Sequence, residues 1–217
     1  MNGFVHIGSM LSTPWVGWVM LALLLLAVLS EALQPGLING VGVSLSSHTN
    51  RNYKPAPDNF FGQTAVTLFR IGTLGMALCL WIGEADGCKI ETYGNALAWI
   101  VGMLLVKIIG TVLIDYTFQL RIAADGIGAH YGNIVTMLCL ALYPAILVLL
   151  QIGNTMLNRW VIGVCGGLFM LAVVYKVLGL YLRQWRSIIY ITLYILTLEV
   201  LPMVSLVVVT SQMKMHL

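Results

Sequence analysis

Six long apolar stretches dominate this sequence and restrict the folds open to it. A helix that crosses the hydrocarbon core of a bilayer needs about 20 consecutive, mainly apolar residues. The stretches that meet this requirement are 15–33, 64–83, 95–118, 133–151, 161–182 and 187–210. The chain is 59% hydrophobic and only 9% charged, whereas about a quarter of an average soluble domain is charged. We therefore predict an all-α membrane protein: a bundle of about six transmembrane helices with short loops, folded as one polytopic domain over residues 1–217.

The charges in the connecting segments favour one orientation of this bundle. Lys and Arg are enriched in the short cytoplasmic loops of membrane proteins. If both termini lie outside, the inner loops hold Arg51, Lys54, Arg121, Arg183 and Arg186, and the outer side holds Lys89, Arg159 and Lys214. This excess predicts that both termini lie outside. The formal net charge of +3 is too small to indicate a nucleic-acid partner.

Five tryptophans lie close to the predicted helix ends. Indole rings are enriched where a membrane protein meets the headgroup region, because they are amphipathic. The residues are Trp15, Trp18, Trp99, Trp160 and Trp185. We expect them to anchor the helix ends in the bilayer interface.

Five ionisable residues interrupt the apolar stretches, and we predict that they form a buried charge network. They are Glu199, Lys107, Asp115, Arg70 and Lys176. At about 1.5 Å per residue, Glu199 and Lys107 each lie roughly 18 Å into their helices, near the middle of the membrane. A charge at that depth costs roughly 2.5–3.5 kcal/mol, so we expect these two residues to pair across helices. Asp115, with Arg70 or Lys176, is expected to form a second layer nearer the inner side.

Pro202 follows Glu199 in the stretch "LEVLP" and offers two interpretations of that carboxylate. Proline has no N–H, so the carbonyl of Leu198 loses its hydrogen bond within the helix. In one interpretation the helix is kinked and Glu199 belongs to a fixed ion pair. In the other, the freed carbonyl and the carboxylate form a polar pocket for a lysine, a proton or a water molecule. Pro144 predicts a second kink, in the fourth stretch.

Two further patterns concern contacts between helices. Tyr190, Tyr194 and Thr197 are spaced to share one helical face; this arrangement is a possible polar ladder, although amphipathic packing is the interpretation we favour. Small residues also recur four apart, and such pairs let helix backbones approach closely. These pairs, Ala98 with Gly102 and Gly163 with Gly167, indicate packing within the bundle or contact with another helix.

No catalytic or metal-binding constellation is recognisable. The histidines, His6, His48, His130 and His216, fall in predicted loops or termini, which disfavours haem ligation by paired helical histidines. "GIGAHYG", at 126–132, lacks the preceding strand and following Lys-Ser/Thr of a phosphate-binding loop, and we predict a turn. Cys79, Cys139 and Cys165 lie in apolar stretches and are interpreted as packing residues, without a disulfide framework. We expect a non-enzymatic protein without cofactor or metal.

The C-terminal third resembles a known family. The segment 175–208 contains Tyr190 and Tyr194 followed by "LEVLP" at 198–202. It resembles an uncharacterised integral-membrane family of Bacteroidota, the domain of unknown function 4271, whose last helix is similarly tyrosine-rich. The segment "VKIIGTVLIDYTF" is similar to the family's lysine-bearing middle helix. The resemblance implies a protein of the bacterial inner, cytoplasmic membrane and implies no activity.

Two functions lead on these observations, and a membrane enzyme ranks third. The first is a membrane subunit or scaffold of a larger cell-envelope complex, whose partners are the lipid bilayer and other membrane proteins. The short loops and the small-residue pairs favour it. The second is a small proton-coupled transporter or proton-pathway subunit that uses Glu199 and Lys107.

Overall fold

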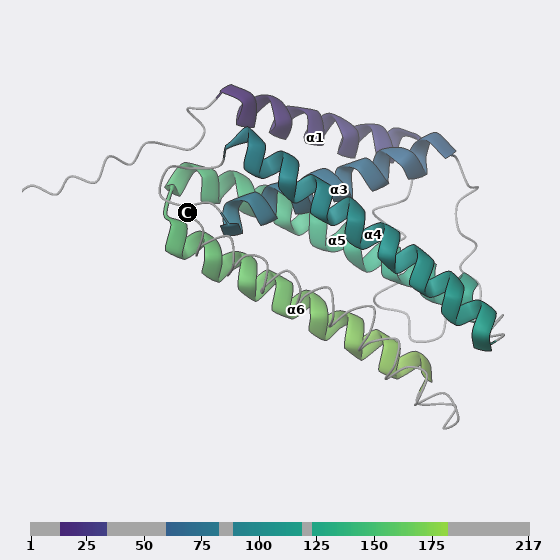
Figure 1. The fold of residues 1–217 in the computed structure, drawn as a ribbon. Helices are drawn as coiled ribbons and strands as arrows, with labels where there is room; N and C mark the ends of the chain where they lie inside the picture. Colours follow the sequence, from purple (N-terminus) through teal and green to yellow (C-terminus); the bar gives the residue numbers. More distant parts are fainter. Residues whose placement is uncertain (1–13, 34–59, 83–88, 119–122, 182–217) are drawn as a thin grey trace, which may run out of the picture.

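The computed structural model describes residues 14–33, 60–82, 89–118 and 123–181. These residues form five helices and no strand: α1 (Pro14–Leu33), α3 (Phe60–Ile82), α4 (Ile90–Phe118), α5 (Ala123–Ile152) and α6 (Thr155–Tyr181). Figure 1 shows α1 along one edge of the bundle and α6 along the opposite edge, with the other three helices between them. The sixth predicted helix, at 187–210, lies outside the described residues.

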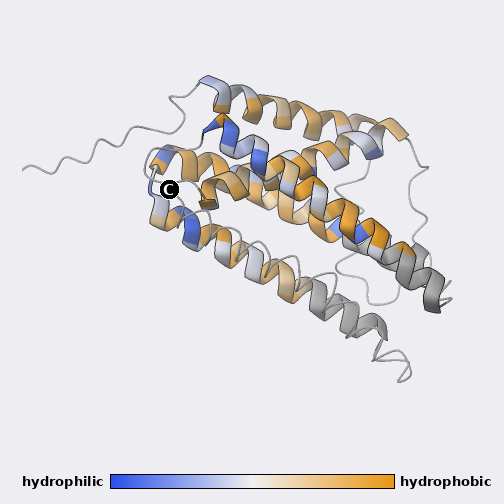
Figure 2. Cartoon of the chain, in the orientation of Figure 1, coloured by the Kyte–Doolittle hydropathy of each residue, from blue (hydrophilic) through white to orange (hydrophobic). Residues whose placement is uncertain are grey.

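Each described helix is long and apolar enough to cross a membrane. The candidate spans are Pro14–Leu33, Phe60–Ile82, Ile90–Gly110, Gly132–Ile152 and Thr155–Ala172. Figure 2 shows hydrophobic residues along the helices, with hydrophilic positions where α4 and α6 begin. The described part of the chain therefore has the architecture of a multi-pass helical membrane protein.

Helix α3 is the centre of the bundle. It packs against all four other described helices, and α5 and α6 also pack against each other. About half of its span, 56%, is buried, against 6% for the spans of α4 and α6. Small residues on several of its faces make this possible, because neighbouring backbones can approach a helix that lacks bulky side chains. The buried small residues of α3 are Gly62, Ala65, Gly72, Thr73, Gly75 and Ala77.

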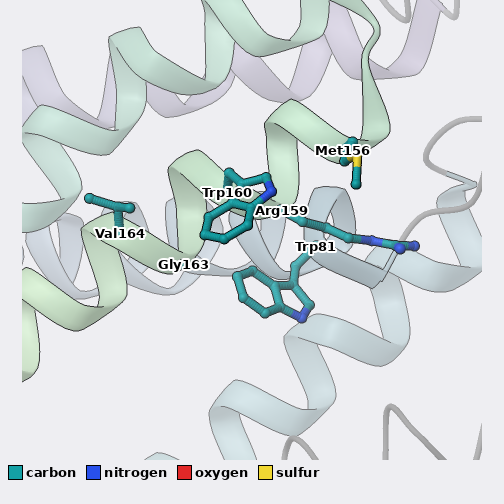
Figure 3. Close-up of a pocket in the computed structure, with 6 residues that line it drawn as sticks. All are labelled: Trp81, Met156, Arg159, Trp160, Gly163 and Val164. Carbon is teal, nitrogen blue, oxygen red and sulfur yellow. The ribbon is translucent and has the colours of Figure 1, made fainter.

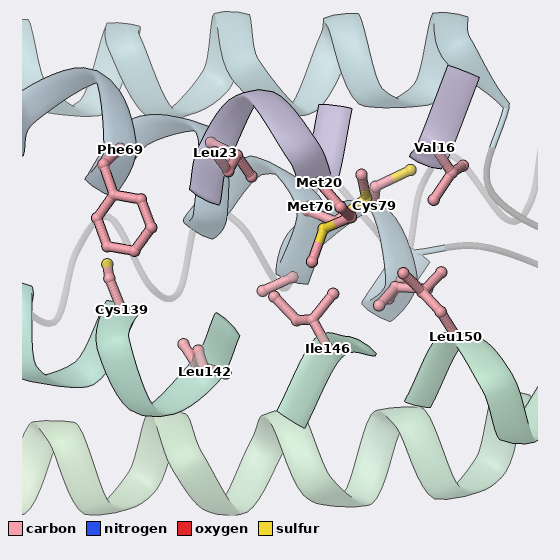
Figure 4. Close-up of a cluster of buried hydrophobic side chains, with 12 residues drawn as sticks. Val16, Met20, Leu23, Phe69, Met76, Cys79, Cys139, Leu142, Ile146 and Leu150 are labelled. Carbon is pink, nitrogen blue, oxygen red and sulfur yellow. The ribbon is translucent and has the colours of Figure 1, made fainter. Parts of the chain in front are cut away.

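Two of these glycines lie directly against side chains of neighbouring helices. A Cβ added to Gly72 would overlap Cδ2 of Leu23 in α1, and one added to Gly75 would lie 2.8 Å from Cδ2 of Leu97 in α4. The largest buried side chains fill the space between α1, α3 and α5, as Figure 4 shows. Phe69, Met76 and Ile146 are among them, each 2% exposed or less.

A two-residue turn reverses the chain between α5 and α6. Gly153 has a φ of 65°, a left-handed conformation that glycine adopts readily at a helix C-terminus, and its N–H donates to the carbonyl of Leu149 at 3.1 Å. The Oδ1 atom of Asn154 then accepts hydrogen bonds from the N–H groups of Met156 and Leu157. These bonds cap the N-terminus of α6 and place α6 antiparallel to α5.

Local structure differs from the sequence prediction at several places. Helices α4, α5 and α6 begin at 90, 123 and 155 rather than at 95, 133 and 161, because partly polar first turns precede the apolar runs, and α3 begins at Phe60 rather than at 64. The "GIGAHYG" segment, predicted as a turn, is helical and contains His130; a glycine inside a helix costs only about 1 kcal/mol relative to alanine. Helix α5 contains Pro144 and continues past it, and the kink predicted there stays a prediction.

The expectation that the cysteines form no disulfide is wrong at Cys79. Cys79 is fully buried near the end of α3, but it is disulfide-bonded. Cys139 and Cys165 are free thiols. The remaining cysteine, Cys88, lies outside the described residues.

Candidate functional site

Arg70 places a positive charge between α3 and α5. It lies ten residues after the start of α3, roughly 15 Å along the helix, and its side chain is half-buried. Its Nε–H donates to Oγ1 of Thr136 at 2.8 Å, and the Thr136 hydroxyl donates to the carbonyl of Gly132 at 2.9 Å. Thr136 is only 2% exposed, so this hydrogen-bond chain lies inside the packing of the two helices.

The backbone around Arg70 is shaped to accept the guanidinium group. Gly132 has no side chain, and a Cβ at that position would lie 3.5 Å from both terminal nitrogens of Arg70. The thiol of Cys139 approaches the carbonyl of Arg70 at 3.9 Å. Because arginine stays protonated in proteins, the site supplies a fixed positive charge and hydrogen-bond donors and does not itself take up or release protons.

Of the other charged residues in the predicted network, the structure describes the side chain of Lys107 only. Lys107 is half-buried and lies on the same face of α4 as Ile100, seven residues earlier, and that face packs toward α3. Asp115 and Lys176 lie near the C-terminal ends of α4 and α6, and their side chains are outside the described set. The structure therefore brings Arg70 to Thr136 and leaves the predicted pairing of Lys107 with Glu199 as a prediction.

The remaining predicted site residues of the last stretch are not covered by the structure. These are Glu199 and Pro202, with the tyrosine ladder of Tyr190, Tyr194 and Thr197. The ion-pair, proton-site and polar-ladder interpretations of this segment therefore stay predictions.

Sequence reasoning missed two tyrosines that bond to backbone carbonyls of neighbouring helices. The Tyr143 hydroxyl of α5 donates to the carbonyl of Met20 in α1 at 3.0 Å. The Tyr93 hydroxyl of α4 lies 3.5 Å from the carbonyl of Gly72 in α3, and its ring contacts Trp15 with the centroids 5.8 Å apart. The sequence could not have shown these bonds, because it does not show which helices are neighbours.

The small-residue pairs predicted for helix contact have different surroundings. Gly163 lies against Trp81 of α3, where an added Cβ would be 3.0 Å from the indole ring. Among the described atoms, none lies within 4 Å of a Cβ at Gly102 or Gly167, and Ala98 is exposed. Gly163 thus serves packing between α3 and α6, whereas Ala98, Gly102 and Gly167 face away from the described bundle.

One comparison with known proteins identifies the chain. No curated protein and no solved structure matches it. A family model, described as "Domain of unknown function (DUF4271)", matches residues 16–209, which is most of the chain and includes all but the first two residues of α1. The match includes Tyr190, Tyr194 and the "LEVLP" segment at 198–202, on which the resemblance of the last stretch rests. The chain therefore belongs to the DUF4271 family.

Proposed function

We propose that this protein is a non-enzymatic subunit or scaffold of a complex in the bacterial inner membrane, and that α4 binds a transmembrane helix of another envelope protein. The observation that carries this proposal is a row of small residues on the outward face of α4. Gly94, Ala98 and Gly102 stand four residues apart. Gly94 and Ala98 are exposed, and a Cβ at either glycine meets no described atom within 4 Å.

The two faces of α4 differ in a way that fits a second helix. One face packs on α3 through Ala96, 2% exposed, and Ile100, 9% exposed. The outward face begins with the small residues and continues, further along the helix, with Leu105 and Ile109, both more than half exposed. Lipid chains cover large apolar side chains well, but a row of small residues, called the α4 groove below, favours close approach of another backbone, as in paired transmembrane helices.

Paired substitutions test the α4 contact. Gly102→Leu fills the groove, and we expect it to reduce the recovery of co-purifying membrane proteins from mild detergent. Gly17→Leu is the matched control, because Gly17 of α1 also has no described atom within 4 Å of an added Cβ. Gly163→Leu is unsuitable for this purpose, since it would collide with Trp81 of the same chain.

Cysteine crosslinking identifies what occupies the groove. A Gly102→Cys variant, crosslinked in membranes, should give an adduct that contains a different protein, whereas Gly17→Cys should not. An adduct of two copies of this chain, or a crosslink within one chain, would assign the groove to another occupant. Equal recovery of partners by the Gly102→Leu and Gly17→Leu variants would contradict the proposal.

The alternative, a proton-coupled transporter, is supported by the position of Lys107 on the inward face of α4. An ionisable group that faces the interior of a bundle is a common component of ion pathways. This alternative depends on Glu199 and is tested separately by substitutions at both positions.

A further inference from the structure

A cavity of about 510 Å³ lies between the end of α3 and the start of α6, at a position that the proposed α4 contact does not use. Figure 3 shows the indole rings of Trp81 and Trp160 beside this cavity, with the side chain of Arg159 close to Trp81. The wall is completed by Met156, Gly163 and Val164. The described lining thus combines one cation, two indole rings and apolar groups, and contains no carboxylate.

Arg159 has hydrogen-bonding capacity left over at this site. Its Nε atom is buried, and within the described residues it has no hydrogen-bond partner. A buried N–H group without an acceptor is costly. An oxyanion in the cavity would meet the terminal nitrogens of the guanidinium, whose planar fork of donors matches a phosphate.

The depth of the cavity corresponds to the headgroup region of a membrane. Trp81 is the penultimate residue of α3, and Arg159 and Trp160 follow the start of α6 by four and five residues, roughly 6–8 Å along the helix. Tryptophan and arginine near the ends of transmembrane helices lie at the level of lipid headgroups. The cavity is therefore positioned to meet the phosphate of a lipid.

An apolar track leads from the cavity along α6. Val164 lines the cavity, and Leu168 and Leu171 follow it at four and seven residues on the same helical face. All three are more than half exposed. Gly167 lies beside them, and no described atom lies within 4 Å of a Cβ added there. The space next to this surface is therefore open to a hydrocarbon chain.

From these observations we propose that this cavity is a binding site for an anionic phospholipid: Arg159 holds the phosphate beside the rings of Trp81 and Trp160, and an acyl chain lies along Val164, Leu168 and Leu171. A headgroup with net negative charge is favoured over a zwitterionic one, because the described lining offers no carboxylate for an ammonium group. The apolar track distinguishes a lipid from free phosphate.

The test uses the full chain, purified in a neutral detergent and titrated with phosphatidylglycerol or phosphatidylcholine, with bound lipid counted by native mass spectrometry. The wild type should bind phosphatidylglycerol more tightly than phosphatidylcholine. Arg159→Gln should weaken phosphatidylglycerol binding about tenfold, the value of one charge-assisted hydrogen bond. Lys89→Gln is the matched control, because Lys89 is exposed just before α4 and does not line the cavity. The affinity of this variant for phosphatidylglycerol should stay within about twofold of the wild-type value.

Val164→Trp gives a second, independent test in case Arg159→Gln does not fold. Val164 is 55% exposed, so the larger ring should be tolerated while it obstructs the acyl track, and phosphatidylglycerol binding should weaken. Excess inorganic phosphate should not displace the lipid. The proposal is overturned if both lipids bind equally, if Lys89→Gln matches the loss of Arg159→Gln, if a folded Val164→Trp variant binds normally, or if phosphate alone competes.

Discussion

Arg70 of α3 and Thr136 of α5 are joined by a hydrogen bond of 2.8 Å between Nε and Oγ1, and this bond connects positions 66 residues apart in the sequence. The bond links α3 and α5, two of the more buried helices, at one position along their lengths. The acceptor is a neutral hydroxyl, which in turn donates a hydrogen bond to the carbonyl of Gly132. Arg70, predicted from the sequence as one member of a charge network, is thus also part of the polar packing between two helices.

Loss of the Thr136 hydroxyl should destabilise the bundle. Thr136→Val keeps the shape of the side chain but leaves Nε of Arg70 without this acceptor. Hydrogen bonds between membrane helices contribute about 0.6–2 kcal/mol, and we expect the free energy of unfolding in detergent to fall by that amount. Thr136→Ser retains a hydroxyl and should restore most of the loss. If Thr136→Val unfolds like the wild type, the bond contributes nothing measurable.

The glycines of α3 should be less tolerant of substitution than glycines on the outside of the bundle. Gly75→Ala would place a Cβ 2.8 Å from Cδ2 of Leu97, which forces a side chain or a helix to move. Overpacking of this kind typically costs about 1–3 kcal/mol. We expect a lower midpoint of thermal unfolding for Gly75→Ala, measured in detergent.

Gly17 provides the matched control for this prediction. An added Cβ at Gly17 meets no described atom within 4 Å, so Gly17→Ala should be neutral or should stabilise α1 by up to about 1 kcal/mol through helix propensity. A Gly75→Ala variant as stable as Gly17→Ala would show that α3 and α4 separate easily.

The sequence predicts the helices well because their signal is local. Apolar runs of about 20 residues mark the membrane spans directly, and each predicted stretch that falls within the described residues contains a helix. The differences lie at the starts, where the chain is already helical before the apolar run begins. The sequence "IGNT", 152–155, contained an available signal for the start of α6: glycine favours a helix C-terminus and asparagine the next N-terminus.

Contacts between helices are harder to predict because they depend on which helices are neighbours and in what register. Nothing near Thr136 in the sequence indicates that it lies opposite Arg70. Trp81, which borders the proposed lipid site, was not among the tryptophans predicted to anchor helix ends. The order of helices around α3 must be known before these pairs can be recognised.

The disulfide at Cys79 gives an expectation for membrane orientation. Disulfides persist in oxidising compartments, and Cys79 lies three residues before the end of α3. Helix α6 begins beside this end, where Gly163 contacts Trp81, and runs toward the opposite end of the bundle. We therefore expect the Cys79 end to face the periplasm and the connection with Arg183 to face the cytoplasm, in agreement with the distribution of Lys and Arg.

Reporter fusions check this orientation. A reporter that is active only in the periplasm should be inactive when inserted beside Arg183 and active at the C-terminus of the chain. The same reporter should be active in the segment after Ile82, which supplies the matched control. Activity beside Arg183 would reverse the orientation.

The last prediction concerns Lys107 and Glu199. Lys107 lies on the inward face of α4, and Glu199 lies near the middle of the last predicted span. If the two residues pair, Lys107→Met and Glu199→Gln should each lower protein abundance, because each leaves one buried charge without its counter-charge. The double variant should recover part of the loss, since it removes both charges. Growth of a strain that depends on the protein then separates the two functions. A fixed pair can be replaced by uncharged residues, so recovered abundance with recovered growth would exclude a proton-carrying role for Glu199, whereas recovered abundance without growth would support one. Wild-type abundance of both single variants would exclude the pair itself.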